Sequence, residues 1–273
     1  MTQPVSPTSS TGRPVGVVAS CFRSPVKSMQ GLTVDSLEFA GTGAVGDRAW
    51  GLIDDASGRL MTAKRFGRLL EAAADDSTIT LPDGRRLSLD SPETSAGLSE
   101  WLGRPVRLTR AAEAAATGYD MTFDPPNDDA EYFEIPTPAG SFLDLAPVHL
   151  ISATTLTACE QARPDLNWEV RRFRPNLVVE VADEIGPFEE ETWTGRSLHV
   201  GSATLSVQSP TVRCAMPLRA QPARDDDPPL DRQRGLFAAM NELNEASPNH
   251  LGLYLGVAVP GTVSVGDQLL LGD

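Results

Sequence analysis

Residues 78–89, TITLPDGRRLSL, contain two short runs of alternating polar and apolar residues joined by Pro82, Asp83 and Gly84. Strand side chains alternate between the two faces of a sheet, and a Pro-Asp-Gly stretch favours a tight turn. We therefore predict a β-hairpin here. The 273 residues include 23 Gly and 22 Pro, which favours many turns and short strands throughout the chain.

Further short segments with strand character lie on both sides of this hairpin, separated by Gly-rich or Asp-rich turns. They are VGVVASCF (15–22), LEFAG (37–41), RAWGLID (48–54), GRLMTA (58–63), GSFLDLAPVHLIS (140–152), NLVVEV (176–181), SLHVGSATLSVQS (197–209) and LYLGVAV (253–259). No internal repeat links them. The expected fold class is mainly β with peripheral helices, an α+β arrangement.

Helices are predicted at SPETSAGLSEWLG (91–103), ATTLTACEQAR (153–163) and RQRGLFAAMNELNEA (232–246). In the first, Ser91 is the expected N-cap, Pro92 the first helical residue and Gly103 the stop. In the second, Cys159 lies on the apolar face, so we expect a buried and unreactive thiol.

The polar stretch 111–136, with PPNDDAEY at its centre, is predicted to connect elements rather than to form a core element. It is either a boundary loop or a lid on the substrate side. Residues 119–134 are our choice for the substrate rim. The acidic segment PARDDDPP (222–229) is expected to be a flexible loop.

Composition narrows the classes of function. A formal charge of −14 argues against binding to nucleic acid, because that affinity comes mainly from Lys and Arg. Any anionic ligand must therefore be held by a local basic cluster. No apolar run approaches the length of a membrane span, and residues 1–13 are Ser/Thr/Pro-rich, so we expect a disordered tail and no membrane contact.

The three cysteines, Cys21, Cys159 and Cys214, lack CxxC or Cys/His metal-ligand spacing and leave at least one thiol unpaired. A reducing, cytoplasmic location fits this best. The chain contains no GxGxxG opening a helix after a strand, no P-loop, no HExxH and no GxSxG elbow.

The segment RRFRPN contains Arg171, Arg172 and Arg174 directly before Pro175 and Asn176. Three guanidinium groups in four residues repel one another unless an anion or carboxylates lie between them. This pattern points to an anion-binding site. The alternative is a solvated basic turn paired with neighbouring acidic loops.

The segment PTVRC places Arg213 before Cys214, after an apolar strand. A thiol beside a positive charge ionises more easily, and soft sulfur suits soft transition metals. The alternative is a buried structural cysteine. A Cys/His hydrolase pairing with His149 or His250 is also open, although His149 lies in an apolar strand and is better explained as a core histidine.

The segment SPVKS (24–28) ends a strand and offers Lys27 as a point charge and Ser28 as a hydroxyl donor to a phosphate. Two further polar segments interrupt apolar strands: GDRAW, with Arg48, and TAK, which ends at Lys64. Each of these signals is weak alone.

Taken in order, SPVKS, GDRAW, LMTAKR, LIS, RRFRPN, VRC and PGTVSVGDQLLL resemble the MOSC family with its N-terminal β-barrel domain, the group that contains the mitochondrial amidoxime-reducing component and bacterial relatives. The resemblance implies two lobes, an N-terminal β-barrel-like domain over 14–135 and a MOSC β-barrel over 136–273. It also implies a molybdenum-pterin cofactor between them, with Cys214 as both molybdenum ligand and catalytic residue. The implied cofactor contacts are Lys27, Ser28, Arg48, Arg172, Arg174, Asn176 and Arg213.

The implied reaction is reduction of N-hydroxylated compounds such as hydroxylamines, amidoximes or N-oxides. A separate electron-donor protein of the ferredoxin or flavoprotein type is expected, because the chain carries no iron–sulfur cysteine cluster. Sulfur transfer and cofactor carriage are the alternatives, and the family also has an association with pyridoxal phosphate. Val212 stands where relatives usually carry a small polar residue, and AMPLRAQP (215–222) replaces their TVDP-like stretch.

Overall fold

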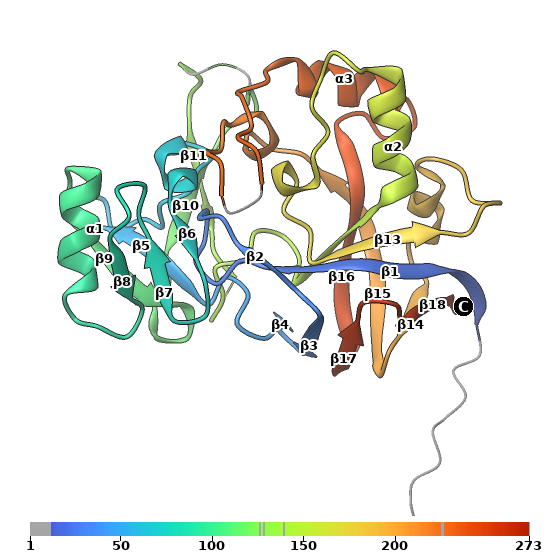
Figure 1. The fold of residues 1–273 in the computed structure, drawn as a ribbon, viewed down its shortest axis with the longest axis horizontal. Helices are drawn as coiled ribbons and strands as arrows, with labels where there is room; N and C mark the ends of the chain where they lie inside the picture. The colour runs from blue at the N-terminus through green and yellow to red at the C-terminus, as the bar shows by residue number, and fades with distance from the viewer. Residues whose placement is uncertain (1–11, 126, 128, 139, 225–226, 273) are drawn as a thin grey trace, which may run out of the picture.

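A computed structural model describes residues 12–125, 127, 129–138, 140–224 and 227–272 (Figure 1). The fold is mainly β with helices at its periphery, and Figure 1 shows two lobes side by side, as predicted. Of the predicted N-terminal tail, residues 1–11 lie outside the described residues, and the first strand begins at Arg13.

The larger lobe is a closed barrel of seven strands, in which each strand pairs with the next and the last pairs with the first. Strands β12 and β13 are parallel, whereas the other neighbours are antiparallel. In barrel order the strands are β13 (Leu177–Val181), β12 (Val148–Ser152), β16 (His250–Val259), β15 (Ala203–Val212), β14 (Ser197–Val200), β18 (Gln268–Leu271) and β1 (Arg13–Arg23).

Strand β1 closes the barrel although it comes from the opposite end of the chain. Its residues Val15, Val18 and Cys21 are buried in the barrel core, and its backbone bonds to both β13 and β18. Strand β1, which lies before the domain boundary expected near residue 135, therefore pairs with strands that lie after it. The following strands also join this lobe: β2 (Leu32–Val34) pairs with β1, while β3 (Ser36–Ala40) lies between β4 (Gly43–Ala44) and β17 (Gly261–Ser264).

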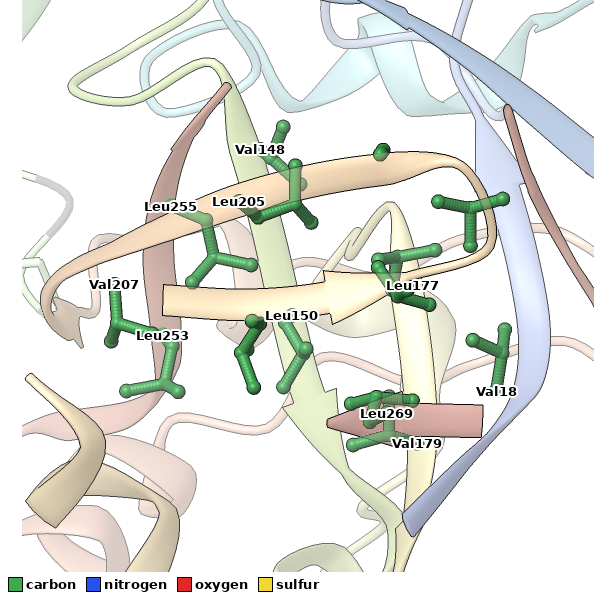
Figure 2. Packing of buried hydrophobic residues seen from close by; sticks show 14 of the residues in the cluster. Val18, Val148, Leu150, Leu177, Val179, Leu205, Val207, Leu253, Leu255 and Leu269 are labelled. Carbon is green, nitrogen blue, oxygen red and sulfur yellow. The ribbon is translucent and has the colours of Figure 1, made fainter. Parts of the chain in front are cut away.

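The barrel interior is filled by aliphatic side chains that point inward from alternate strand positions (Figure 2). Leu150 of β12, Leu205 of β15 and Leu253 of β16 are fully buried. Burying each such side chain contributes about 2 kcal/mol. This packed core rules out a ligand inside the barrel and leaves the barrel rim as the place for a site.

The smaller lobe is built from short antiparallel strands around a second apolar core. The predicted hairpin is present as β7 (Thr78–Thr80) and β8 (Arg86–Ser88), and Gly84 supplies the turn with φ +84°. The neighbouring elements are β5 (Trp50–Asp54), η1 (Gly67–Glu71), β6 (Ala73–Ala74), α1 (Thr94–Leu102), β9 (Val106–Arg110) and η2 (Ala111–Glu113).

The three predicted helices are present. Helix α1 begins at Thr94, later than predicted, so Pro92 is not its first residue; the Ser91 hydroxyl instead accepts a bond from the Glu93 amide (3.3 Å). Gly103 ends α1 in the left-handed conformation, as predicted. The remaining helices are α2 (Ala153–Ala162), α3 (Gly235–Leu243), η3 (Val170–Arg172), η4 (Glu189–Trp193) and η5 (Met216–Leu218).

The prediction of a purely connecting segment over 111–136 is wrong. Strands β10 (Gly118–Met121) and β11 (Phe133–Pro136) pair there, and Tyr119 is completely buried in a core with Leu60 and Phe142. Buried contacts to residues far away in sequence outweigh the polar character of the segment.

Candidate functional site

The eight residues that the family resemblance assigns to the cofactor and the metal line one cavity at the junction of the two lobes, whereas none of residues 119–134, chosen as the substrate rim, is among its described lining residues. The cavity encloses about 700 Å³, including its opening to solvent. The smaller lobe and the turn after β1 supply Lys27, Ser28 and Arg48; the segment before β13 supplies Arg172, Arg174 and Asn176; and the end of β15 supplies Arg213 and Cys214.

Three of these residues have a left-handed backbone: Ser28 with φ +67°, Arg48 with φ +49° and Arg174 with φ +55°. Non-glycine residues rarely adopt this conformation, and the cost of order 1 kcal/mol is accepted where surrounding structure imposes it. The clustering of these residues around one cavity indicates that the backbone is shaped to aim their side chains.

Asp47 and Asn176 connect the lobes beneath the cavity. The Asp47 carboxylate accepts bonds from the Ser24 amide (2.7 Å) and from Nδ2 of Asn176 (3.0 Å), and it also pairs with Arg48. The Asn176 side-chain oxygen accepts from the His149 amide at 3.1 Å. Asn176 is therefore fully occupied as a brace between β12 and the smaller lobe.

Arg172 is also occupied by the protein itself. Its guanidinium donates to the carbonyl oxygens of Pro217 (3.1 Å) and Asp231 (2.9 Å) and to the Asn167 side chain (3.1 Å). Burial lowers the pKa of Arg172. We predicted that Arg172 contacts an anion, but each of its three guanidinium nitrogens already donates to the protein. These bonds hold the segment after Cys214 in place.

Arg213 is buried beside His149. It donates to the carbonyl oxygens of Leu251 (2.9 Å) and Phe173 (3.3 Å), and its Nη2 lies 2.5 Å from His149 Nε2. Burial lowers the pKa of Arg213 to about 10. Burial, followed by the charge of Arg213, also lowers the pKa of His149 far below its usual value, so this histidine is neutral and accepts from the arginine.

Lys27 and Lys64 share a single carboxylate oxygen of Asp144, at 2.7 and 2.9 Å. Both ammonium groups also lie over the ring of Tyr119, at 5.6 and 4.1 Å from its centre. Burial lowers the pKa of Lys27 to about 8. Burial opposes charge on Asp144 as well, but the two ammonium groups outweigh it and lower the pKa of Asp144.

Cys214 differs from the other two cysteines in its exposure. It is partly exposed on the cavity wall, whereas Cys21 and Cys159 are buried in apolar cores. Burial raises the pKa of Cys21 to about 11 and that of Cys159 to about 12, which keeps both as thiols. The buried structural role considered for Cys214 is thus wrong, while it holds for Cys159 as predicted.

Two polar atoms on the cavity walls are buried without a hydrogen-bond partner among the residues that the structure describes: Nη2 of Arg174 and the hydroxyl of Thr211. An unpaired buried donor costs about 1–3 kcal/mol, so such atoms mark places where a ligand or water completes the structure. The other Arg174 nitrogen, Nη1, donates to the Met29 carbonyl at 2.7 Å. Arg174 is therefore anchored, with one donor left for an anion.

Sequence reasoning missed four residues of the cavity, or did not select them: Lys64, Asp144, Thr211 and Tyr254. Lys64 gave a weak signal as a charge inside an apolar strand. Asp144 was hidden in a segment expected to be an ordinary strand, and only the fold brings it between two lysines that are 117 and 80 residues away.

The chemistry available in this cavity is a single accessible thiol among basic groups. Within the described part of the chain, no three His, Cys, Asp or Glu side chains gather as a metal-binding group. A metal here would thus take one protein ligand, the sulfur of Cys214, and further ligands from the molecule that carries it. None of the described helices is long and apolar enough to cross a membrane.

The chain is similar to several known proteins. Human mitochondrial amidoxime-reducing component 1 is 24% identical over 301 residues, covering 94% of this chain and 83% of the human protein. The rice molybdenum cofactor sulfurase is 25% identical over 236 residues, covering 70% of this chain but 27% of the sulfurase. The YuaD structure from Bacillus subtilis superposes with a TM-score of 0.44 and 10% identity, covering 94% and 95% of the two chains.

Models of two domains match most of the chain. The MOSC N-terminal beta barrel domain matches residues 15–120, and the MOSC domain matches residues 139–270. The predicted cavity residues are divided between the two matches, with Lys27, Ser28 and Arg48 in the first and the remainder in the second. This chain belongs to the MOSC family and carries the N-terminal β-barrel domain of that family.

Proposed function

We propose that this protein binds a molybdenum-pterin cofactor through Cys214 and reduces N-hydroxylated compounds. The observation that carries the proposal is the partly exposed thiol of Cys214 in a cavity that also holds several Lys and Arg side chains. A thiolate is a suitable ligand for a soft metal, and Arg and Lys side chains are suited to a phosphate. The relatives named after amidoxime reduction and after the molybdenum cofactor support the same assignment.

The residues present fit such a cofactor. Within the described part of the chain, Nη2 of Arg174 is buried and unpaired, and so is the hydroxyl of Thr211, which lies near the end of β15. The Ser28 oxygen accepts from the Ala63 amide at 3.0 Å, which leaves its hydrogen free to donate. These three groups would hold the anionic part of the cofactor while Cys214 holds the metal.

Lys27 and Arg48 would take part indirectly. Lys27 is paired with Asp144 and Arg48 with Asp47. Each cation therefore already has a counter-charge, and a phosphate would have to share it or replace it. We assign Lys27 and Arg48 the task of keeping the cavity positive rather than that of sole phosphate ligands.

When bound, the cofactor would supply two-electron chemistry that removes oxygen from an N–OH group, giving the N–H product and water after uptake of two protons. Burial lowers the pKa of Lys27 to about 8, so its Nζ holds a proton at neutral pH and gives it up more readily than an ordinary lysine does. Leu143 and Phe173 on the cavity wall would limit access of bulk water.

Electrons would come from a separate ferredoxin or flavoprotein, and we place the protein in the cytoplasm, where its free thiols stay reduced. The match to the sulfurase favours one second candidate, transfer of sulfur to the bound cofactor. Cofactor carriage without catalysis is the third.

The test is reduction of a panel of hydroxylamines, amidoximes and N-oxides by chemically reduced, purified protein. We expect turnover by the wild type, loss in Cys214→Ala, and near-normal turnover in Cys159→Ala, which removes a thiol outside the cavity. Molybdenum-loaded protein that reduces none of the panel would exclude the reductase. If that protein instead accepts sulfur from a persulfide donor, the sulfurtransferase is the correct function.

A further inference from the structure

A second cavity, separate from the Cys214 cavity, opens between the end of β1 and η3. It encloses about 1210 Å³, including its opening to solvent, by the same measure that gives 700 Å³ for the Cys214 cavity. Among the residues that the structure describes, four arginines and two carboxylates line it. Because the whole chain carries a formal charge of −14, this local excess of positive charge is not a consequence of composition.

Among the described residues, two of these arginines contain a buried nitrogen with no hydrogen-bond partner, Nε of Arg23 and Nη1 of Arg171, in addition to the Arg174 Nη2 already assigned to the cofactor. They come from two segments far apart in sequence, the end of β1 and the segment before β13, so their meeting is a product of the fold. One unpaired donor is common in a protein, but two from separate segments at one cavity call for acceptors that the described part of the chain does not supply.

The existing partners fix the arginines without satisfying them. Arg23 pairs with Asp76 at the surface and reaches the Val45 carbonyl at 3.4 Å. Arg171 pairs with Glu169 and donates to the Pro228 carbonyl at 2.8 Å, while its Nη1 is 3.7 Å from Asp227, beyond hydrogen-bond distance. Held in place in this way, the guanidinium groups lose little entropy when they bind a ligand.

We propose that this arginine cavity, defined by Arg23, Arg171 and Arg174, binds a small phosphate-bearing molecule. Guanidinium groups bind phosphate through paired hydrogen bonds, and the cavity also offers the hydroxyls of Ser20 and Thr33 as neutral donors. Arg174 is the one arginine that lines both cavities. The two cavities share this one side chain, and their other lining residues differ, so the second site is distinct from the proposed cofactor site.

Inorganic pyrophosphate is the probe, titrated into the purified full-length protein by calorimetry at constant ionic strength with chloride as reference. We expect saturable binding that weakens about tenfold in Arg171→Gln and in Arg23→Gln, since each change removes a charged donor. Arg163→Gln is the matched control, because Arg163 pairs with Asp165 and Glu242 and lines neither cavity. Thermal melting confirms that each variant is folded.

Two further variants separate this proposal from the proposed function. Cys214→Ala should bind pyrophosphate as the wild type does, and Arg171→Gln should keep its molybdenum. If binding is unchanged in both Arg171→Gln and Arg23→Gln, the site is excluded. If Ser28→Ala abolishes binding instead, the anion lies in the Cys214 cavity, and the proposal is overturned.

Discussion

The Nη2 atom of Arg213, the residue that precedes Cys214, lies 2.5 Å from the Nε2 atom of His149. An arginine remains charged at neutral pH and can only donate, so His149 must accept and stay neutral. The strand β12 that carries His149 is thereby tied to the end of β15 that carries Cys214. The histidine is thus a structural support of the site, which removes it as a general base for a hydrolase.

His149 should make the protein less stable as the pH falls from 7 to 5. Its pKa is lowered in the folded state by burial and by Arg213, so below pH 6.5 the unfolded chain binds the extra proton and folding is disfavoured. The loss is limited to about 1.4 kcal/mol per pH unit. Urea unfolding of the wild type and His149→Gln at pH 5 and pH 7 measures it as a difference between the two proteins. His250→Gln is the control, and an equal pH response in wild type and His149→Gln would show that His149 is protonated in the fold.

Glu190 should act in the opposite direction. It is fully buried, with Thr155 donating to its carboxylate at 2.8 and 2.9 Å, and burial raises its pKa from 4.5 to about 7. Stability present below pH 4.5 is therefore lost as the pH rises through 7, by about 3 kcal/mol in total. Glu190→Gln should lack this loss between pH 5 and pH 8, whereas Glu180→Gln, at an exposed position of β13, should behave as the wild type. A parallel pH response in all three proteins would contradict the assignment.

Asp144→Asn should cost more stability than Lys64→Met. Removing the carboxylate leaves two buried ammonium groups together without a counter-charge, whereas removing Lys64 leaves the Lys27–Asp144 pair intact. The Asp144 side chain is 31% exposed, which limits the expected loss to about 2 kcal/mol. Chemical denaturation at pH 7 compares the two variants, and a larger loss in Lys64→Met would mean that the carboxylate is not what holds the lysines.

Tyr119 tests the finding that residues 111–136 contain a core element. Its ring is fully buried and lies 4.1 Å from the Lys64 ammonium. Tyr119→Ala should lower the free energy of unfolding by about 3–5 kcal/mol, while Tyr119→Phe, which keeps the ring, should change it by less than about 1 kcal/mol. If both variants change the free energy of unfolding by equally small amounts, this segment is a surface connection and not a core element.

Strand alternation and turn residues were sufficient to predict the hairpin at 78–89, most of the strands and the fold class, but the strand predicted at 58–63 is wrong, because Leu60 forms only isolated bridges there. Part of the Cys214 cavity was also predictable, because Arg174, Asn176 and Arg213 occur in short motifs whose order along the chain is distinctive. Pairing between distant segments could not be predicted. The local sequence does not indicate that β1 closes a barrel with β13, or that Asp144 lies between two lysines.

Local charge also proved ambiguous for function. Arg171, Arg172 and Arg174 occur within four residues, but they have different surroundings in the fold. Arg172 donates to backbone carbonyls, Arg171 lines the second cavity, and Arg174 lines both cavities. The motif correctly indicated a basic site, and only the three-dimensional structure separates the donors that are available from those already satisfied.

The most direct test of the central claim is the molybdenum content of the purified protein, measured by mass spectrometry of the metal alongside pterin fluorescence. We predict molybdenum in the wild type and in Cys159→Ala, and its loss in Cys214→Ala with the fold intact. Molybdenum retained at the wild-type level in Cys214→Ala would contradict the role of Cys214 as the metal ligand.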